Sequence, residues 1–346
     1  MFMKKLLSIV LFGLLLVCLG ACSGESASSN GSKEKEQTTN ESNYPDKPIT
    51  IVAPSGAGGG LDTTSRALAK ILDQTELVSE TMTVENKPGG GQVVGTVEFA
   101  NKEVGNDYKL LLTSTPFILN NLKKEGNSPI SYRDITPLAQ LVTENAVLAV
   151  SADSQYKDLS SLMEDLKENP SNITFAGGSG PGSYDHLNIV YPAMKAEVDV
   201  KSIKYVSYDG GGEALTALLG GNADVVSSDV ASVYEYQKAG KVRILGVSSA
   251  ERLPGEFKDI PTYKEQGVDV ELTNWRGIFG PKDMTADAKK YWEEKIEALV
   301  TTEDWKNELN NLGFQDGFLN SEDFIKQIEK EEVMYKEILT TLGMQK

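Results

Sequence analysis

Short β-branched segments, each followed by a glycine-rich turn and then by an apolar stretch with helical spacing, recur along this chain from Pro48 onward. In the first of them, residues 49–53 lead through a turn at 54–61 to residues 62–72, whose apolar side chains repeat at helical spacing. Repetition of strand, turn and helix is typical of an α/β fold with a parallel sheet. Because the 346 residues exceed the size at which single cores stop growing, about 250–300 residues, we expect two lobes.

The same pattern gives a coarse map of the remaining elements. We expect further strands at residues 81–85, 110–113, 147–151, 173–176, 203–206, 225–228 and 244–247. We expect the helices between them at residues 93–100, 159–167, 184–196, 213–219 and 230–239. The C-terminal stretch 286–342 is helical in its pattern almost throughout, with Trp292, Ile296 and Trp305 among its buried positions. No internal repeat is visible, which excludes solenoids and propellers.

The first residues indicate export and a lipid anchor. Lys4 and Lys5 precede an apolar run at 6–17 that is too short for a stable membrane-spanning helix. The run leads to Leu19-Gly20-Ala21-Cys22, which looks like a bacterial lipobox. We therefore expect a lipoprotein signal peptide at 1–21, lipidation of Cys22, and an extracytoplasmic protein held at the bacterial cell membrane. The alternative is an ordinary secretory signal with an incidental cysteine.

The segment that follows differs in composition from the rest of the chain. Residues 22–43 are mostly Ser, Asn, Glu, Lys, Gln and Thr. Almost no apolar side chain is available there to offset the entropy of ordering. We expect a disordered tether between the lipidated Cys22 and a folded body that begins at Tyr44.

Charge and metal-ligand counts exclude several classes of protein. The chain carries 34 Lys and Arg against 50 Asp and Glu, a net charge of −16, which disfavours binding to nucleic acid phosphates. With two cysteines and one histidine, a disulfide-rich scaffold and an ordinary Cys/His zinc site are excluded. We expect no metal and no cofactor.

Three glycine-rich turns stand at expected junctions between a strand and a helix, at residues 54–62, 177–183 and 208–213. Glycines allow close approach of the backbone to a ligand, and the start of a helix offers unpaired N–H donors, so such turns suit an anion. The first turn is not a Walker P-loop, since no Lys-Ser or Lys-Thr follows it, and dinucleotide-fingerprint spacing is absent. Any single turn of this kind is explained by a tight connection. Three together favour a cleft beyond the carboxyl ends of the strands.

At this point the sequence resembles a known family, the extracytoplasmic solute receptors of tripartite tricarboxylate transporters, also called Bug-type receptors. The resemblance runs from about Tyr44 to the C-terminus. Its motifs are Tyr44 to Ile49, Ala57 to Asp62 with Arg66, Glu85 to Gly91 with Gly95, Gly180 to Ser183 with His186 and Leu187, Tyr208 to Asp224, Leu253 to Thr262 with Glu265 and Gly267, and Trp275 with Gly277. Ser55 and Gly56 depart from the pattern, because many members carry an aromatic residue and a proline there.

The resemblance implies an α/β fold of the two-lobed periplasmic-binding-protein type (Venus flytrap, type 2-like), with a ligand cleft between the lobes. Residues 44–142 together with 249–346 would form the first lobe, and residues 143–248 the second. Hinges are expected near 143–147 and 244–248. The implied function is capture of a small carboxylate, a di- or tricarboxylate such as citrate, and its delivery to the membrane permease of a tripartite transporter. We expect a monomer that is not an enzyme.

By similarity, the first and third turns would grip the ligand like pincers. The sequence itself does not choose among dicarboxylates, tricarboxylates, aromatic acids and amino acids, and it offers no bidentate arginine that would do so. The residues expected to contact the ligand are Gly58, Gly59, Asp62, Thr63, Ser114, Thr115, Ser179, Ser183, Tyr208, Gly210, Gly211 and Asp229. Asp62 has a second interpretation as the N-cap of its helix. Asp229 would repel an anion unless it is paired or bonds an ammonium group or water.

Two other functions remain open. A serine hydrolase would need Ser179 or Ser183 as nucleophile with His186 as base, but neither serine lies in a Gly-x-Ser-x-Gly elbow. A surface lipoprotein with a sensing or scaffolding role is compatible with the composition. One argument opposes the sensing or scaffolding role. Glycines at three junctions cost backbone entropy, and a cleft that binds no ligand would not explain that cost.

Overall fold

The computed structural model describes residues 43–126, 128–208 and 210–346. The expected signal peptide at 1–21, Cys22, and all of the tether except its last residue lie outside these ranges, so those predictions stay untested. The described residues form one compact unit. Among the described residues, no helix has both the length and the apolar character needed to cross a membrane.

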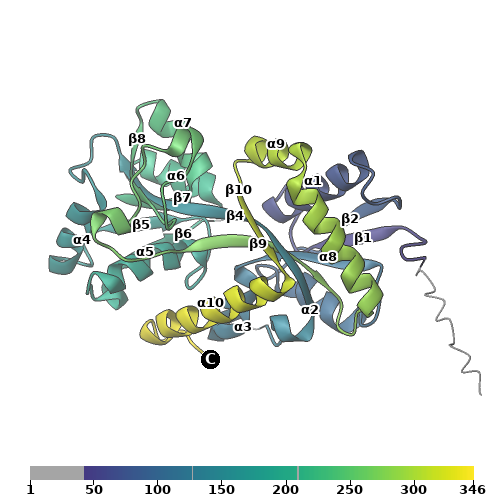
Figure 1. Ribbon diagram of the computed structural model, residues 1–346. Helices are drawn as coiled ribbons and strands as arrows, with labels where there is room; N and C mark the ends of the chain where they lie inside the picture. Colours follow the sequence, from purple (N-terminus) through teal and green to yellow (C-terminus); the bar gives the residue numbers. More distant parts are fainter. Residues whose placement is uncertain (1–42, 127, 209) are drawn as a thin grey trace, which may run out of the picture. The chain divides into compact units, whose positions relative to one another are not determined.

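The first lobe is built on three parallel strands that continue into antiparallel ones (Figure 1). Strand β1 lies between β2 and β3, which explains its nearly unbroken apolar sequence. The strands are β1 (Ile49–Ala53), β2 (Met82–Asn86), β3 (Lys109–Ser114), β9 (Thr273–Gly280), β4 (Thr136–Ser151) and β10 (Gln315–Asn320). The helices are α1 (Gly60–Gln74), α2 (Val93–Lys102), α3 (Pro116–Leu122), α8 (Ala286–Thr301), α9 (Glu303–Leu312) and α10 (Ser321–Thr341).

The second lobe repeats the arrangement with fewer strands. Strand β5 is parallel to β6 on one side and to β7 on the other, and both β7 and β8 run antiparallel to the end of β4. The strands are β5 (Thr174–Gly177), β6 (Lys204–Ser207), β7 (Val225–Asp229) and β8 (Val242–Val247). The helices are α4 (Leu159–Glu168), α5 (Tyr184–Lys195), α6 (Gly211–Leu219) and α7 (Val230–Lys238).

Strand β4 joins the two lobes, and β9 runs beside it (Figure 1). The first part of β4, up to Asn145, pairs with β9, and the last part, from Ala146, pairs with β7 and β8. In each lobe the parallel strands lead into turns that begin a helix: β1 into α1 and β3 into α3, then β5 into α5, β6 into α6 and β7 into α7. The carboxyl ends of parallel strands meet at one edge of a sheet, so each lobe gathers its turns at one edge.

The C-terminal region differs from the predicted, almost continuous helix. Strand β10 interrupts it at residues 315–320 and pairs with β4. The segment Gln-Asp-Gly-Phe-Leu-Asn has no strong strand propensity of its own, but pairing with β4 satisfies its backbone groups. The buried positions predicted on the flanking helices are confirmed, since Trp292, Ile296 and Trp305 are at most 1% exposed. Strand β9 and helix α3 were not predicted, and β4 begins well before the expected residue 147.

Candidate functional site

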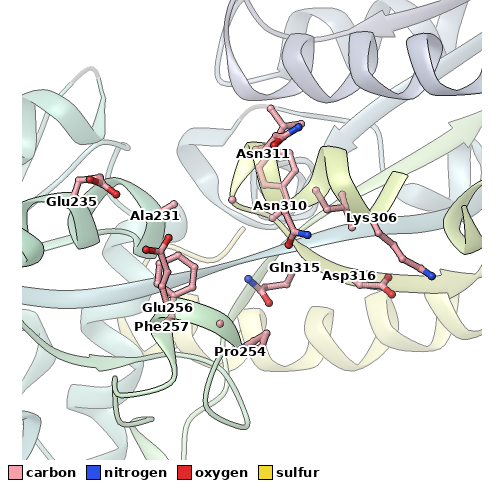
Figure 2. Close-up of a pocket in the computed structure, with 15 residues that line it drawn as sticks. Ala231, Glu235, Pro254, Glu256, Phe257, Lys306, Asn310, Asn311, Gln315 and Asp316 are labelled. Carbon is pink, nitrogen blue, oxygen red and sulfur yellow. The ribbon is translucent and has the colours of Figure 1, made fainter. Parts of the chain in front are cut away.

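A cavity of about 860 Å³ lies between the lobes, where α7 and residues 254–257 face α9 and the start of β10 (Figure 2). Gly313 and Phe314, which connect α9 to β10, form one wall. At Gly313 the backbone passes close to Ala231 of α7, on the opposite lobe. None of the predicted contact residues lies among the described residues that line this cavity. Phe314 also stacks on Arg276, which belongs to a second group of polar side chains.

The centre of this second group is Arg276 of β9. Its guanidinium is stacked on the Phe314 ring, 4.2 Å from the ring centroid, and its side chain is only 8% exposed. One terminal nitrogen, Nη1, donates to the carbonyl of Gly60 at 2.7 Å and to the hydroxyl of Thr64, both in the first turn of α1. A Cβ at Gly60 would come within 2.6 Å of the other terminal nitrogen, Nη2. Glycine at residue 60 therefore lets the start of α1 pack on Arg276.

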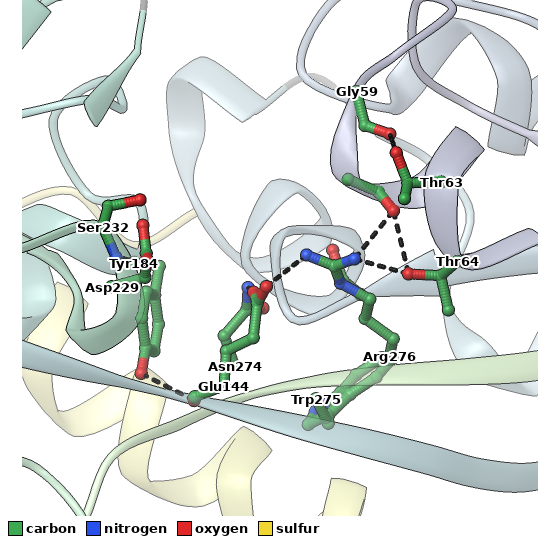
Figure 3. Close-up of polar contacts among 12 residues, drawn as sticks. Gly59, Thr63, Thr64, Glu144, Tyr184, Asp229, Ser232, Asn274, Trp275 and Arg276 are labelled. Atoms are coloured by element: carbon green, nitrogen blue, oxygen red, sulfur yellow. Dashed lines mark hydrogen bonds and ion pairs between the residues drawn. The ribbon is translucent and has the colours of Figure 1, made fainter. Parts of the chain in front are cut away.

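The charge of Arg276 is balanced by Glu144 of β4. Nη2 of Arg276 donates to one carboxylate oxygen, Oε1, and the amide of Asn274 donates to the other, Oε2, at 3.0 Å. Figure 3 shows this chain of contacts between Gly59 and Thr63 on the side of α1 and Asp229 on the side of the second lobe. The amide oxygen Oδ1 of Asn274 is buried and has no hydrogen-bond partner within the part of the chain that the structure describes. Because β9 and β4 are the strands that run between the lobes, the pair lies at their junction.

Asp62 is buried beneath the first glycine turn and bonds to it. Its carboxylate accepts hydrogen bonds from the Gly58 N–H at 2.8 Å and from the Asn86 amide at 2.9 Å, and it pairs with Arg66. These contacts, above all that with Arg66, lower the pKa of Asp62 to about 2. The N-cap interpretation of Asp62 is wrong, because helix α1 begins at Gly60 with Gly59 as its N-cap. Thr63 donates its hydroxyl to the Gly59 carbonyl at 3.1 Å.

The second and third glycine turns pack directly against each other. A Cβ at Gly178 would lie 2.3 Å from the Gly211 nitrogen and 2.5 Å from the Gly210 carbonyl carbon. Ser179 is engaged within this contact region, since its hydroxyl accepts from the Asp185 N–H and its carbonyl accepts from the Tyr205 hydroxyl. The two turns therefore form one continuous edge of the second lobe.

Helix starts at this edge differ in how they are capped. Gly210 before α6 and Ser183 before α5 make no side-chain cap, whereas Asp229 accepts from the Ser232 N–H at 2.8 Å and caps α7. At α5 the Asp185 N–H already bonds the Ser179 hydroxyl, whereas at α6 the N-cap residue Gly210 has no side chain that could accept from the first N–H groups. Asp185 lies close by, and burial together with the charges of Asp229 and Glu144 raises its pKa to about 6.

The other predicted contact residues have defined partners or lie apart. Ser114 accepts from the Gln92 amide at 2.8 Å, and the Thr115 hydroxyl accepts from the Trp275 N–H at 3.2 Å. Tyr208 lines a separate hollow of about 440 Å³ along α6. The start of α1 therefore contacts Arg276 directly and Asp229 lies on the second lobe's side of the Arg276 group (Figure 3), while Tyr208 borders a different surface.

His186 bonds to the backbone of the second glycine turn and packs on an aromatic ring. Its Nδ1 accepts from the Gly182 N–H at 3.0 Å, and its ring packs on Tyr205 with the centroids 4.6 Å apart. Burial lowers the pKa of His186 to about 4. In the described part of the chain no hydrogen bond joins it to Ser179 or Ser183, so the geometry gives no support to a hydrolase triad.

Sequence reasoning missed Arg276, Glu144 and Asn274. Trp275 and Gly277 are part of the family resemblance, and Arg276 lies between them in the sequence. This position was the one local signal that could have pointed to Arg276. Arg276 and Glu144 are 132 residues apart, and only the pairing of β4 with β9 brings them together.

The chain is similar in sequence to a known protein family. The family model described as tripartite tricarboxylate transporter family receptor (TctC) matches residues 65–344. A UPF0065 protein from the tcbD–tcbE intergenic region of Pseudomonas sp. strain P51 is 28% identical over 274 residues, which cover 79% of each chain.

Solved structures share the fold. A TctC solute-binding protein from Polaromonas is 26% identical, with a TM-score of 0.73 over 86% of this chain and 100% of that one. MatC from Rhodopseudomonas palustris, solved with malate, is 22% identical with a TM-score of 0.67 over 86% of this chain and 100% of MatC. Rpa4515 of the same species, solved with adipate, is 22% identical with a TM-score of 0.72 over 87% and 99%. The predicted two-lobed α/β binding-protein fold is confirmed.

Proposed function

Because this chain belongs to the tripartite tricarboxylate transporter receptor family of extracytoplasmic solute-binding proteins, we propose that it captures a small di- or tricarboxylate, such as citrate, and delivers it to the permease of such a transporter. The observation that carries the proposal is a pair of helix starts, α1 in the first lobe and α6 in the second, whose N-cap residues Gly59 and Gly210 provide no side-chain cap. Unpaired N–H groups and the helix dipole favour a carboxylate at such positions.

The ligand class draws support from the structural neighbours. MatC was solved with malate and Rpa4515 with adipate, and both ligands are dicarboxylates. A net charge of −16 does not oppose this class, because N–H groups act at contact distance while exposed charges are screened beyond about 8–10 Å.

The contact residues predicted from the sequence remain part of the proposal, with one refinement. Gly59, Ser183, Gly210 and Gly211 would contact the ligand at the starts of their helices. The remaining residues of the first lobe and Ser179 already bond to protein groups, so we assign them to shaping the turns: Gly58, Asp62, Thr63, Ser114, Thr115 and Ser179. Asp229 and Tyr208 stay candidates for the second lobe's side.

We place the lobe boundaries after residues 142 and 248, with 44–142 and 249–346 in one lobe and 143–248 in the other. The change of partner in β4 supports this division, since Asn145 pairs with Thr273 of β9 and Ala146 with Asp229 of β7. A carboxylate that contacts both lobes would favour the closed form through its differential contacts, with hinges near 143–147 and 244–248. The closed monomer would then dock on the permease, and the lipid on Cys22 would keep it at the membrane.

Ligand binding to purified protein tests the proposal. Malate, adipate or citrate at a hundred times its dissociation constant should stabilise the fold by about 2.7 kcal/mol, which a thermal-shift assay detects. Gly210→Val should abolish this shift while the unliganded Tm stays unchanged, because residue 210 has extended backbone geometry and a Cβ there meets no atom within 4 Å. If no di- or tricarboxylate shifts the Tm of folded protein free of copurified ligand, the scaffolding or sensing function is favoured instead.

A further inference from the structure

The ion pair between Arg276 and Glu144 lies where the two lobes meet, and its position fits a role in ligand binding. Arg276 lies against the first turn of α1, the helix start that carries the proposed anion contacts of the first lobe. Its side chain is 8% exposed and that of Glu144 is 18% exposed. A guanidinium so placed is a strong and geometrically specific partner for a carboxylate.

Glu144 already supplies a carboxylate to Arg276. The contact uses Nη2 alone, because Nη1 is directed to the Gly60 carbonyl and the Thr64 hydroxyl. Exchange of Glu144 for a ligand carboxylate would keep Arg276 in an ion pair, and the displaced Glu144 carboxylate, whose side chain is already 18% exposed, would turn to solvent.

The surroundings favour such an exchange. Among the described residues, the Glu144 carboxylate accepts one side-chain hydrogen bond besides that from Arg276, which comes from the Asn274 amide, and the buried Asn274 Oδ1 has no partner there. A ligand that replaced Glu144 would also contact the starts of α1 and α6, whose N-cap glycines provide no side-chain cap. Those contacts span both lobes, and Glu144 alone cannot make them.

Resting on the proposed function, we propose that Arg276 is the charged anchor for one carboxylate of the ligand and that Glu144 is the internal carboxylate that holds this position until the ligand arrives. The exchange makes Glu144 a specificity-determining residue. It competes with every incoming anion, so only ligands with a further acceptor group that reaches the second lobe displace it. Di- and tricarboxylates meet this condition, and monocarboxylates such as acetate do not.

Isothermal titration of the purified full chain with malate, citrate and acetate tests the anchor. Arg276→Gln should weaken malate and citrate binding by more than about tenfold, because a hydrogen-bonded charge is lost. Arg276→Lys, which keeps the charge without the planar fork, should bind with intermediate affinity. Glu144→Gln should bind malate and citrate more tightly than the wild type and should bind acetate measurably, because the competing charge is gone.

The opposite signs of the two substitutions separate this role from a structural one. If the ion pair only holds β4 to β9, Arg276→Gln and Glu144→Gln both lower affinity, and that outcome overturns the proposal. Arg133→Gln is the matched control, since Arg133 pairs with Glu332 far along the sequence and its side chain is 56% exposed. The affinity of Arg133→Gln for malate and citrate should equal that of the wild type.

Failure of the broader function would look different. If the wild type binds neither malate nor citrate, both the carboxylate receptor function and the anchor are wrong. If the wild type binds them and Glu144→Gln does not bind more tightly, only the exchange is wrong. Melting temperatures of all variants, measured without ligand, show whether the fold is retained, and Glu144→Gln still decides the question if Arg276→Gln unfolds.

Discussion

Glu331 of α10 is a buried acidic residue that contacts strand β9. Its carboxylate accepts from the Trp275 indole of β9 and from the Gln327 amide, both at 2.8 Å. Burial raises the pKa of Glu331 from 4.5 to about 7, although these hydrogen bonds oppose the shift. The residue thus connects α10 to the strand that carries Arg276.

The raised pKa predicts a pH dependence of stability. Since the folded chain holds the Glu331 proton up to about pH 7 and the unfolded chain loses it near 4.3, this group's contribution to the free energy of unfolding falls as pH rises between those values. Glu331→Gln removes the titrating group and keeps an acceptor for Trp275. We expect the Tm of Glu331→Gln minus that of the wild type to grow by several degrees from pH 4.5 to pH 8.

Thermal unfolding across that pH range measures the effect. Glu329→Gln is the control, because Glu329 is an exposed residue on the same helix, and its difference from the wild type should vary little with pH. A constant difference for Glu331→Gln would show that Glu331 does not titrate in this window.

Turns are the elements that position the second lobe's side of the site. The turn at 177–183 and the start of α6 are in backbone contact at Gly178. Gly178→Ala places a methyl group against main-chain atoms, and we expect a loss of about 1–3 kcal/mol in stability with weaker ligand binding. Chemical denaturation and titration of the ligand measure both quantities.

Gly180 provides a control within the same turn. A Cβ at that residue meets no atom within 4 Å and its φ is not positive, so Gly180→Ala should leave stability and affinity unchanged. Equal effects of the two substitutions would mean that the loss at Gly178 reflects general turn chemistry and not the contact with α6.

At the scale of the whole molecule, two strands carry the connection between lobes at the site, β4 and β9. A ligand that joins the start of α1 to the start of α6 must change how the lobes lie, and the two strands are the segments that would bend. We expect malate or citrate to lower the radius of gyration measured by small-angle X-ray scattering. Arg276→Gln at the same ligand concentration should show no decrease, and an unchanged radius for ligand-saturated wild type would contradict lobe closure.

The sequence predicted much of the fold because the information is local. Alternation of strand and helix, the buried faces of α8 and α9, and the turns before α1, α5 and α6 all follow from spacing within about twenty residues. Strand β10 escaped prediction because its apolar pattern is weak and its strand conformation depends on pairing with β4. Asp62 was assigned as a possible cap because only the structure shows that its oxygens turn inward to Gly58 and Asn86.

The sequence by itself determined an α/β chain with glycine turns at its helix starts and a resemblance that indicated carboxylate binding. Only the tertiary structure decided which charges meet at the centre of the site. Arg276 and Glu144 are remote in sequence, and no periodicity links them. They meet because antiparallel register places Asn274 opposite Glu144 and brings Arg276 alongside, and strand register depends on the packing of the whole sheet.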